Sequence, residues 1–240
     1  MIKNYCPLIL LLFACVMMAA CTSINSSAQK KEEAAASATS EFPSGTATHS
    51  SGSTNTVTSY QEYFNWVRKP ENGLEVSKKL GIFEYTLRYK PVLYEVLFTA
   101  GRTKWNNRRL INERVKDLSS QQFFLFTIKV PTNEATELLK INLTSEEEYK
   151  ERVNYCSFHI QEDLFLVDGN DTLPCSFAHF ERAYNNASLL QFSLAFPSRS
   201  QQVNNKIFIC RDRLFDMGQI NIRIPKEVLS QIPNVNQDQL

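Results

Sequence analysis

The chain has 240 residues, of which 43% are hydrophobic and 21% charged, and these proportions fit one globular domain with an additional segment. Its seven glycines exclude a collagen-like chain, and they form neither G-x-G-x-x-G nor G-x-x-x-x-G-K, so no dinucleotide or P-loop site is expected. A formal net charge of +1 gives no basic excess to neutralise phosphates, so nucleic acid is not an expected partner.

The chain begins with a short apolar segment. Lys3 is the one charged side chain of residues 1–7, and residues 8–20 are thirteen consecutive apolar residues. As a helix this segment is about 20 Å long, which is too short for a bilayer core of about 30 Å. A basic start, a short apolar stretch and small residues at its end predict a secretory signal peptide over residues 1–20.

The end of this segment carries a family signature. Met18-Ala19-Ala20-Cys21 resembles the lipobox of bacterial lipoproteins, which implies that Cys21 is lipidated and becomes the first residue of the mature chain. A competing box ends at Cys15, but apolar residues follow Cys15 whereas polar residues follow Cys21, so the pattern favours Cys21. Ordinary signal-peptidase cleavage, with Cys21 unmodified, is the alternative. Two or more acyl chains, such as palmitate, hold a protein on a bilayer without a spanning helix.

Residues 21–58 are predicted to form a disordered tether. They are rich in Ser, Thr, Ala and Gly, with too few large apolar side chains to offset the entropy of ordering. The run from Gln29 to Glu33 resembles the export tag of surface-displayed lipoproteins in Bacteroidetes, and a solvated charge cluster is the alternative. We therefore expect an outer-membrane location and leave open its periplasmic or surface-exposed face.

Residues 59–240 have the patterns of a folded domain. In chain order, helices are predicted at 60–67, from Pro91 to about Gly101, and at 107–118. Apolar alternation predicts strands through residues 83–89 and 124–130. A capping box at 144–147 predicts a helix that ends near Asn154.

The last third of the chain predicts successive strands. They are short, aromatic or β-branched, and separated by turn residues such as 168–171. Their expected ranges are 155–160, 164–167, 173–180, 190–196, 206–210 and 219–224. Short strands at about ten-residue spacing predict a mainly β (α+β) fold, an antiparallel β-sandwich or barrel-like domain with a few short helices.

Two Cys–His pairs raise the question of a zinc site. If 155–160 is a strand, Cys156 and His159 point to opposite faces and do not converge on one ion. Cys175 and His179 share a face of the next strand, but two ligands do not make a structural site. No metal and no cofactor are expected.

Three cysteines remain after those of residues 1–21. If Gly169-Asn170 is a hairpin turn, paired residues sum to 339, which places Cys175 opposite Leu164 and away from Cys156. We expect Cys156, Cys175 and Cys210 to be buried thiols, and a disulfide from one of the others to Cys210 is the alternative.

The sequence gives catalysis little support. It has no G-x-S-x-G elbow, and Cys175 and His179 on one strand face are separated by about 7 Å, too far for a nucleophile and its base. No catalytic residue is therefore predicted.

Two surface features favour binding. The segment from 102 to 117 contains six basic residues and only two acidic ones, with one tryptophan among them. Such a patch suits acidic glycans or phosphorylated headgroups. The ordinary alternative is a solvated helix face. The candidate binding patch is Arg102, Lys104, Trp105, Arg108 and Arg109.

The segment Asp171-Thr172-Leu173 resembles the O-glycosylation sequon of exported Bacteroidetes proteins, which implies a glycan on Thr172.

Segments 83–91 and 173–182 resemble the uncharacterised lipoprotein domains of Bacteroidetes, which implies location and fold class but no activity. The resulting hypothesis is a non-enzymatic envelope lipoprotein, anchored in the bilayer through Cys21, that binds an envelope protein or glycan. The alternatives are a hydrolase that acts on envelope polymers and a structural spacer.

Overall fold

A computed structural model describes residues 56–131, 137–181, 188–199 and 202–235. All of them belong to one compact unit, Ser51–Leu240. The predicted signal peptide 1–20, Cys21 and the tether as far as residue 55 lie outside the described residues, so their predictions stay predictions.

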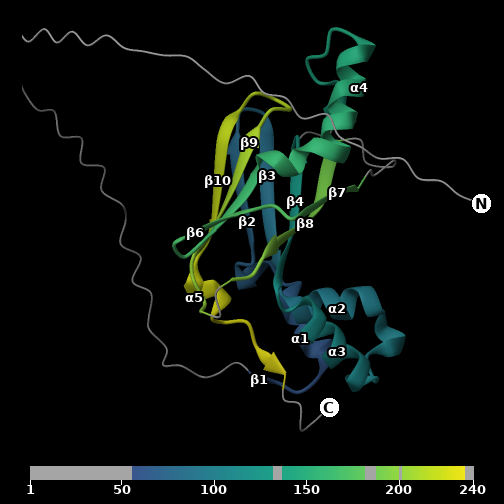
Figure 1. The fold of residues 1–240 in the computed structure, drawn as a ribbon, viewed down its shortest axis with the longest axis vertical. Coiled ribbons are helices and arrows are strands. Elements are labelled where there is room, and N and C mark those ends of the chain that lie inside the picture. The colour runs from purple at the N-terminus through teal and green to yellow at the C-terminus, as the bar shows by residue number, and fades with distance from the viewer. Residues whose placement is uncertain (1–55, 132–136, 182–187, 200–201, 236–240) are drawn as a thin grey trace, which may run out of the picture. The chain divides into compact units, whose positions relative to one another are not determined.

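Two antiparallel sheets form the body of the domain (Figure 1). The five-stranded sheet has the order β2 (Glu75–Leu80), β3 (Phe83–Lys90), β4 (Gln121–Lys129), β8 (Leu189–Pro197) and β7 (Phe177–Glu181). The four-stranded sheet has the order β10 (Gly218–Ile224), β9 (Lys206–Asp212), β5 (Leu164–Asp168) and β6 (Asp171–Pro174).

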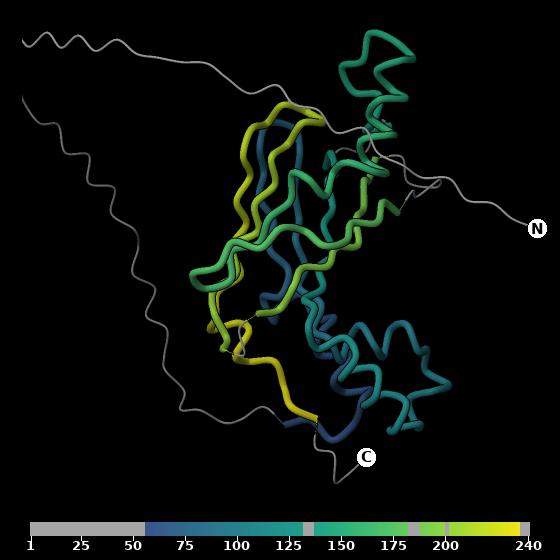
Figure 2. Tube along the Cα trace, viewed as in Figure 1, coloured from purple at the N-terminus to yellow at the C-terminus, as the bar shows by residue number. Residues whose placement is uncertain are grey.

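The two sheets enclose one core. The edge strands β10 and β2 pack beside each other, and the opposite edge strand β6 packs beside β8, the strand next to the edge of the other sheet. Figure 2 traces this path. The predicted fold class, mainly β with antiparallel sheets and a few short helices, is confirmed.

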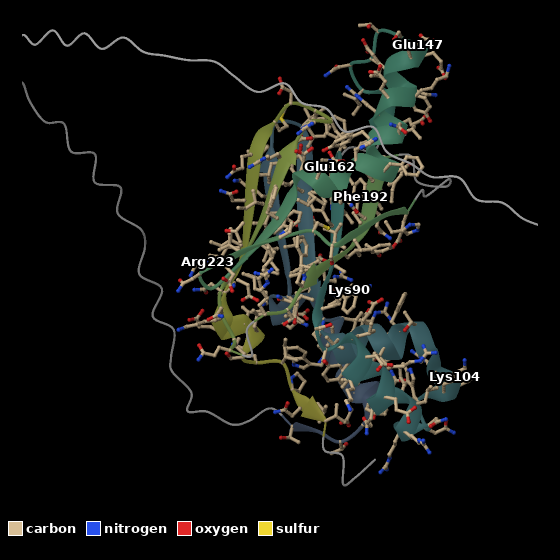
Figure 3. The ribbon with its side chains drawn as sticks, viewed as in Figure 1. Lys90, Lys104, Glu147, Glu162, Phe192 and Arg223 are labelled. Atoms are coloured by element: carbon tan, nitrogen blue, oxygen red, sulfur yellow. The ribbon has the colours of Figure 1, made fainter. Side chains whose placement is uncertain are left out.

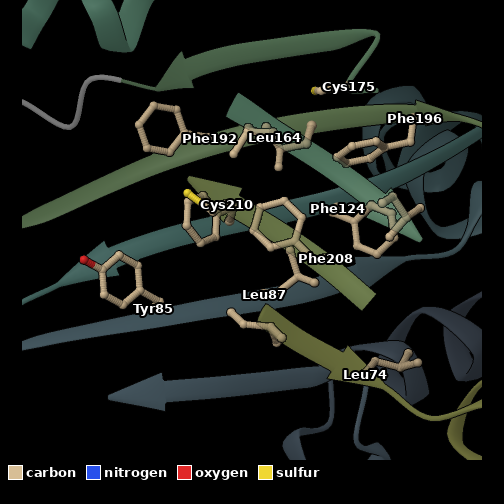
Figure 4. Close-up of a cluster of buried hydrophobic side chains, with 14 of the residues drawn as sticks. Leu74, Tyr85, Leu87, Phe124, Leu164, Cys175, Phe192, Phe196, Phe208 and Cys210 are labelled. Atoms are coloured by element: carbon tan, nitrogen blue, oxygen red, sulfur yellow. The ribbon is translucent and has the colours of Figure 1, made fainter. Parts of the chain in front are cut away.

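Aromatic side chains fill the space between the sheets (Figure 4). The period of two along β4 turns Phe124 and Phe126 inward, and both are fully buried. The ring centroid of Phe126 lies 4.9 Å from that of Phe208 on β9, which belongs to the other sheet. Burial of such rings is a main source of the stability of this core.

Three helices pack at one end of the sheets: α1 (Tyr60–Val67), α2 (Val92–Ala100) and α3 (Arg108–Leu118). α1 and α3 each begin with a capped N-terminus. The Ser59 hydroxyl accepts a hydrogen bond from the backbone N–H of Glu62, and the Asn107 side chain accepts one from the backbone N–H of Leu110. These three helices confirm the sequence prediction. α2 ends before Gly101, whose φ of 74° suits glycine.

The remaining elements are short. They are β1 (Thr56–Val57), η1 (Pro70–Asn72), η2 (Arg102–Lys104), η3 (Leu138–Lys140), α4 (Glu146–Asn154), η4 (Tyr155–His159), η5 (Ile160–Asp163), α5 (Lys226–Leu229) and β11 (Asn234–Val235). β1 pairs in parallel with β11, and α1 packs against both.

The predicted strand at 155–160 is wrong. Residues Tyr155–His159 form the π-helix η4, which continues α4 and leads into η5. Cys156 and Ile160 are both buried, and their spacing of four residues is helical. The aromatic and β-branched composition of the segment therefore gave a misleading strand signal, which tertiary packing overrides.

The predicted strand at 173–180 is also wrong, because it is two strands in different sheets. β6 ends at Pro174, where the backbone has no N–H to continue a ladder. The Cys175 N–H donates to Leu164 O of the four-stranded sheet, and the next N–H, that of Ser176, donates to Ala195 O of the other sheet. The chain thus crosses between the sheets at Cys175 and Ser176.

The capping box of α4 lies one residue later than predicted. Ser145, not Thr144, is the N-cap, and its hydroxyl accepts from the backbone N–H of Glu148. The Glu148 carboxylate reaches back to Thr144, accepting from its backbone N–H at 2.9 Å and from its hydroxyl at 2.8 Å.

Candidate functional site

A basic surface lies on the helical end of the domain. Its basic residues are exposed and belong to η2 and α3: Arg102, Lys104, Arg108, Arg109, Arg114 and Lys116. The acidic residues of α3 are Glu113, which pairs with Arg109 at 2.8 Å, and Asp117. Figure 3 shows Lys104 at the tip of this helical end. The structure therefore places the predicted cationic residues on α3 and on the short connection η2 that precedes it.

Trp105 supports this connection from inside. Its indole Nε1–H donates to Leu97 O at 2.8 Å, and its ring lies 5.1 Å from that of Phe64. The guanidinium of Arg102 lies 5.9 Å from the centroid of the Trp105 ring. These contacts pack the half-buried indole against α1 and α2, where it supports η2 and the Arg102 side chain, and its contact with a ligand stays a prediction.

Thr172 lies on β6, next to a hairpin turn, and is exposed. The strand register pairs Val167 with Thr172 and Phe165 with Pro174, which confirms the turn predicted at Gly169-Asn170. O-glycosylation of Thr172 stays a prediction.

The Cys–His pairs do not converge. Cys156 is fully buried, whereas His159 is exposed and its Nδ1 lies 3.2 Å from Glu162 Oε1. Cys175 is buried at the crossing between sheets, and His179 is exposed on β7, so the predicted shared face is wrong. Within the described ranges, no three His, Cys, Asp or Glu residues are grouped for metal binding.

The three cysteines are buried free thiols. Burial raises the pKa of Cys156 to about 12 and that of Cys175 to about 12, and it raises the pKa of Cys210 as well. Because the thiolate is the nucleophile, these side chains are unreactive at neutral pH and serve packing.

Two adjoining cavities lie at the opposite end of the domain, and we call them the distal cavities. One has a volume of about 300 Å³ and the other about 330 Å³. Arg152 of α4, Arg213 and Leu214 line both. Phe83, the first residue of β3, lines the larger one, whereas β3 ends at Lys90 beside α2. At about 3.3 Å per residue, roughly 23 Å therefore separates the distal cavities from the helical end.

Protein contacts occupy part of each of the two shared guanidinium groups, and that of Arg152 also lies 5.5 Å from the centroid of the Phe215 ring. Arg152 Nη1 donates to Leu139 O at 3.2 Å and to Ile141 O at 2.7 Å. Arg213 Nε lies 2.9 Å from Asp163 Oδ2. A guanidinium has five N–H donors in a planar fork, so both groups keep donors for an acidic ligand.

Buried carboxylates fix the loop that carries Arg213. Asp163, with 1% of its side chain exposed, also accepts a hydrogen bond from Tyr155 Oη at 2.8 Å. Burial and this carboxylate raise the pKa of Tyr155, so its hydroxyl stays a donor. Asp212 likewise accepts from Tyr85 Oη at 2.7 Å and from the Leu214 N–H at 2.9 Å. The cavity wall is therefore rigid at this loop.

The rim of the larger cavity has an unusual backbone. Asn142 and Asp216 both line it, with φ of 56° and 55°, and they are the two non-glycine residues of the described ranges with positive φ. Asn and Asp tolerate the left-handed region better than other side chains. Such backbone conformations concentrate at binding sites.

Glu148 does not have the feature expected of the acid in a hydrolytic pair. It lines the smaller cavity together with Glu151, and the general acid of a glycosidase needs a raised pKa. Hydrogen bonds from the backbone and side chain of Thr144 instead lower the pKa of Glu148. Glu148 acts as a helix-capping group.

Sequence reasoning missed Arg152 and Arg213, because no local motif marks them and 61 positions separate them. None of the helices in the described ranges is both long and apolar enough to cross a membrane. No protein-family model, curated protein or solved structure matches this chain.

Proposed function

We propose that the protein is an outer-membrane lipoprotein, held by acyl chains on Cys21, whose β-rich domain is a non-enzymatic binding module for an acidic partner. The observation that carries the anchor is the sequence Met18-Ala19-Ala20-Cys21, followed at once by polar residues. Each buried acyl methylene contributes about 0.8 kcal/mol, so two or more chains make dissociation from the membrane negligible.

The N-terminus of the mature protein tests the anchor. Mass spectrometry of the protein purified from its native membrane should identify an N-terminal peptide that begins at Cys21 and carries the mass of acyl chains. Cys21→Ser should abolish this peptide and move the protein out of the membrane fraction. Cys15→Ser, a matched change in the competing box, should leave both unchanged. An unmodified terminus in the wild-type protein contradicts the proposal.

The distal cavities support the binding role. Arg152 and Arg213 present guanidinium donors beside the apolar rings of Phe83 and Phe215, whose centroids are 4.2 Å apart. Guanidinium groups bind carboxylates of peptides or glycans through paired hydrogen bonds, and neighbouring rings supply apolar contact. We therefore assign the acidic partner to this end of the domain.

Photocrosslinking in cells tests this assignment. A photoreactive amino acid at Met217, which lines the larger cavity and is 37% exposed, should form a discrete adduct. The same residue at Arg223, exposed on β10, is the positional control and should not form it. Adding Arg152→Gln should reduce the Met217 adduct while the circular dichroism spectrum stays unchanged. Equal labelling at Met217 and Arg223 would rule out a specific site here.

A further inference from the structure

The basic surface is close to the point where the chain enters the domain. The first described strand, β1, pairs with β11, and α1 packs against both. A cavity of about 280 Å³ between these elements is lined by Tyr60 of α1, Asn112 and Val115 of α3, and Val235 of β11. α3, which carries most of the basic surface, therefore shares this cavity with β11, the strand that pairs with the entry strand β1.

The distance to the predicted anchor is bounded by the chain itself. Thirty-four residues separate Cys21 from Thr56, and even fully extended they span at most about 120 Å. If Cys21 is lipidated, every encounter between the domain and the bilayer is intramolecular, so a weak attraction suffices to keep one face on the membrane.

The helical end also exposes an aromatic ring next to the basic surface. Phe98 of α2 is 59% exposed, one helical turn before η2. Lys90 Nζ lies 5.3 Å from the centroid of this ring. An exposed ring beside a cation suits the boundary between headgroups and acyl chains, where apolar and polar groups meet.

We propose that the basic surface docks on anionic phospholipid headgroups, so that the helical end rests on the bilayer and the distal cavities face away from it. The surface has six exposed cationic side chains and only two acidic ones, one of which is paired with Arg109. Arginine binds phosphate oxygens with its planar fork, and clustered basic residues act together with an acyl chain as two membrane signals. This inference depends on the proposed lipidation for its biological setting but not for its test.

Vesicle binding of the protein from Thr22 onward, which has no lipid, tests the surface separately from the anchor. Cosedimentation in 50 mM salt should detect binding to vesicles with 30% phosphatidylglycerol but not to pure phosphatidylcholine. The partition coefficient should fall at least tenfold in 300 mM salt, because the attraction is electrostatic.

Two charge variants locate the attraction. Arg102→Gln, Lys104→Gln, Arg108→Gln and Arg114→Gln together should lower the partition coefficient at least fivefold. The matched control removes four exposed charges at the distal end, at Lys79, Lys140, Lys150 and Arg211, again by Gln. It should change binding less than twofold. Equal losses in the two variants, or equal binding to both kinds of vesicle, overturn the docking proposal and leave the anchor untouched.

Fluorescence quenching tests the orientation. A fluorophore on Lys104→Cys should be quenched by a membrane-embedded quencher, and one on Met217→Cys should not. The buried native thiols resist labelling, because burial raises their pKa. Quenching at both positions, or protection of Lys104→Cys by an acidic glycan or protein in place of lipid, rejects the phospholipid as the occupant.

Discussion

Asp168 on β5 and Lys206 on β9 face each other across the two strands, with 3.0 Å between Asp168 Oδ2 and Lys206 Nζ. Both side chains are buried, and Gln122 Nε2 also donates to Asp168 Oδ2 at 2.8 Å. The group closes the core at the end nearest the helices, where the inner face of the sheets changes from aromatic to polar.

Removal of Lys206 should be more damaging than removal of the whole pair. Lys206→Met leaves the Asp168 carboxylate buried without its cation, which should lower the free energy of unfolding by about 3–5 kcal/mol. The double variant Asp168→Leu/Lys206→Met should recover most of this loss, since it buries no charge. Urea denaturation of the protein from Thr22 onward measures both. A double variant no more stable than the single one contradicts this account.

The aromatic core makes a different prediction. Phe126 is fully buried, and its ring contacts those of Tyr85, Phe192 and Phe208. Phe126→Ala should lower the free energy of unfolding by about 3–5 kcal/mol, because it leaves a cavity between the sheets. Phe177→Ala is the control, since that ring is 56% exposed, and should change stability by at most about 0.5 kcal/mol. If urea denaturation gives similar losses of unfolding free energy for the two variants, Phe126 is not part of the stabilising core.

Local periodicity was enough to predict the elements that have one buried face. The alternation of Phe124, Phe126 and Ile128 specified β4, and the helical spacing of apolar residues specified α1 and α3. β2 was missed, because only Val76 and Leu80 give it an apolar pattern. The strand predicted at 155–160 was wrong for the opposite reason, since its aromatic residues are helical and Phe158 is 72% exposed.

The two candidate sites also differ in how far the local sequence predicts them. The basic surface is contiguous in the sequence, so residues 102–116 were sufficient to identify it. The distal cavities depend on the approach of α4 to the loop after β9, which brings Arg152 and Arg213 together. Only the tertiary fold defines that approach, and each arginine by itself is an ordinary surface charge in the sequence.

The buried thiols predict a loss of stability at alkaline pH. Burial raises the pKa of Cys175 to about 12, whereas in the unfolded chain the thiol ionises near 8.5. The stabilising contribution of a raised pKa is complete below about pH 8.5 and is lost as the pH rises toward 12. At pH 10 the loss should be about 2 kcal/mol for this thiol.

Cys175→Ala should therefore reduce the fall in unfolding free energy between pH 8 and pH 10, measured by urea denaturation at each pH. In parallel, a thiol reagent at pH 8 should not react with the folded protein and should modify three cysteines after unfolding. Rapid modification of a native thiol, or an unchanged pH dependence in the variant, would show that Cys175 is accessible.

The capping box of α4 allows neighbouring glutamates to be compared directly. The Glu148 carboxylate accepts two hydrogen bonds from Thr144, which lower its pKa, whereas Glu147 is exposed and has no such bond. Glu148→Ala should speed hydrogen exchange of the Thr144 amide by about 3- to 10-fold, and Glu147→Ala should not. Both variants change helix propensity equally, so the difference isolates the cap.

The same box should respond to acid. Because the pKa of Glu148 is lowered in the folded state, its contribution is present above the unfolded pKa of about 4.3 and is lost as the pH falls through the lower folded value. Protection of the Thr144 amide should therefore decrease below about pH 4 in the wild-type protein and stay constant in Glu148→Ala. α4 carries Arg152, so an N-terminus frayed by acid loosens one wall of the distal cavities. If protection of the Thr144 amide in the wild-type protein does not depend on pH, the ionised Glu148 carboxylate is not what protects it.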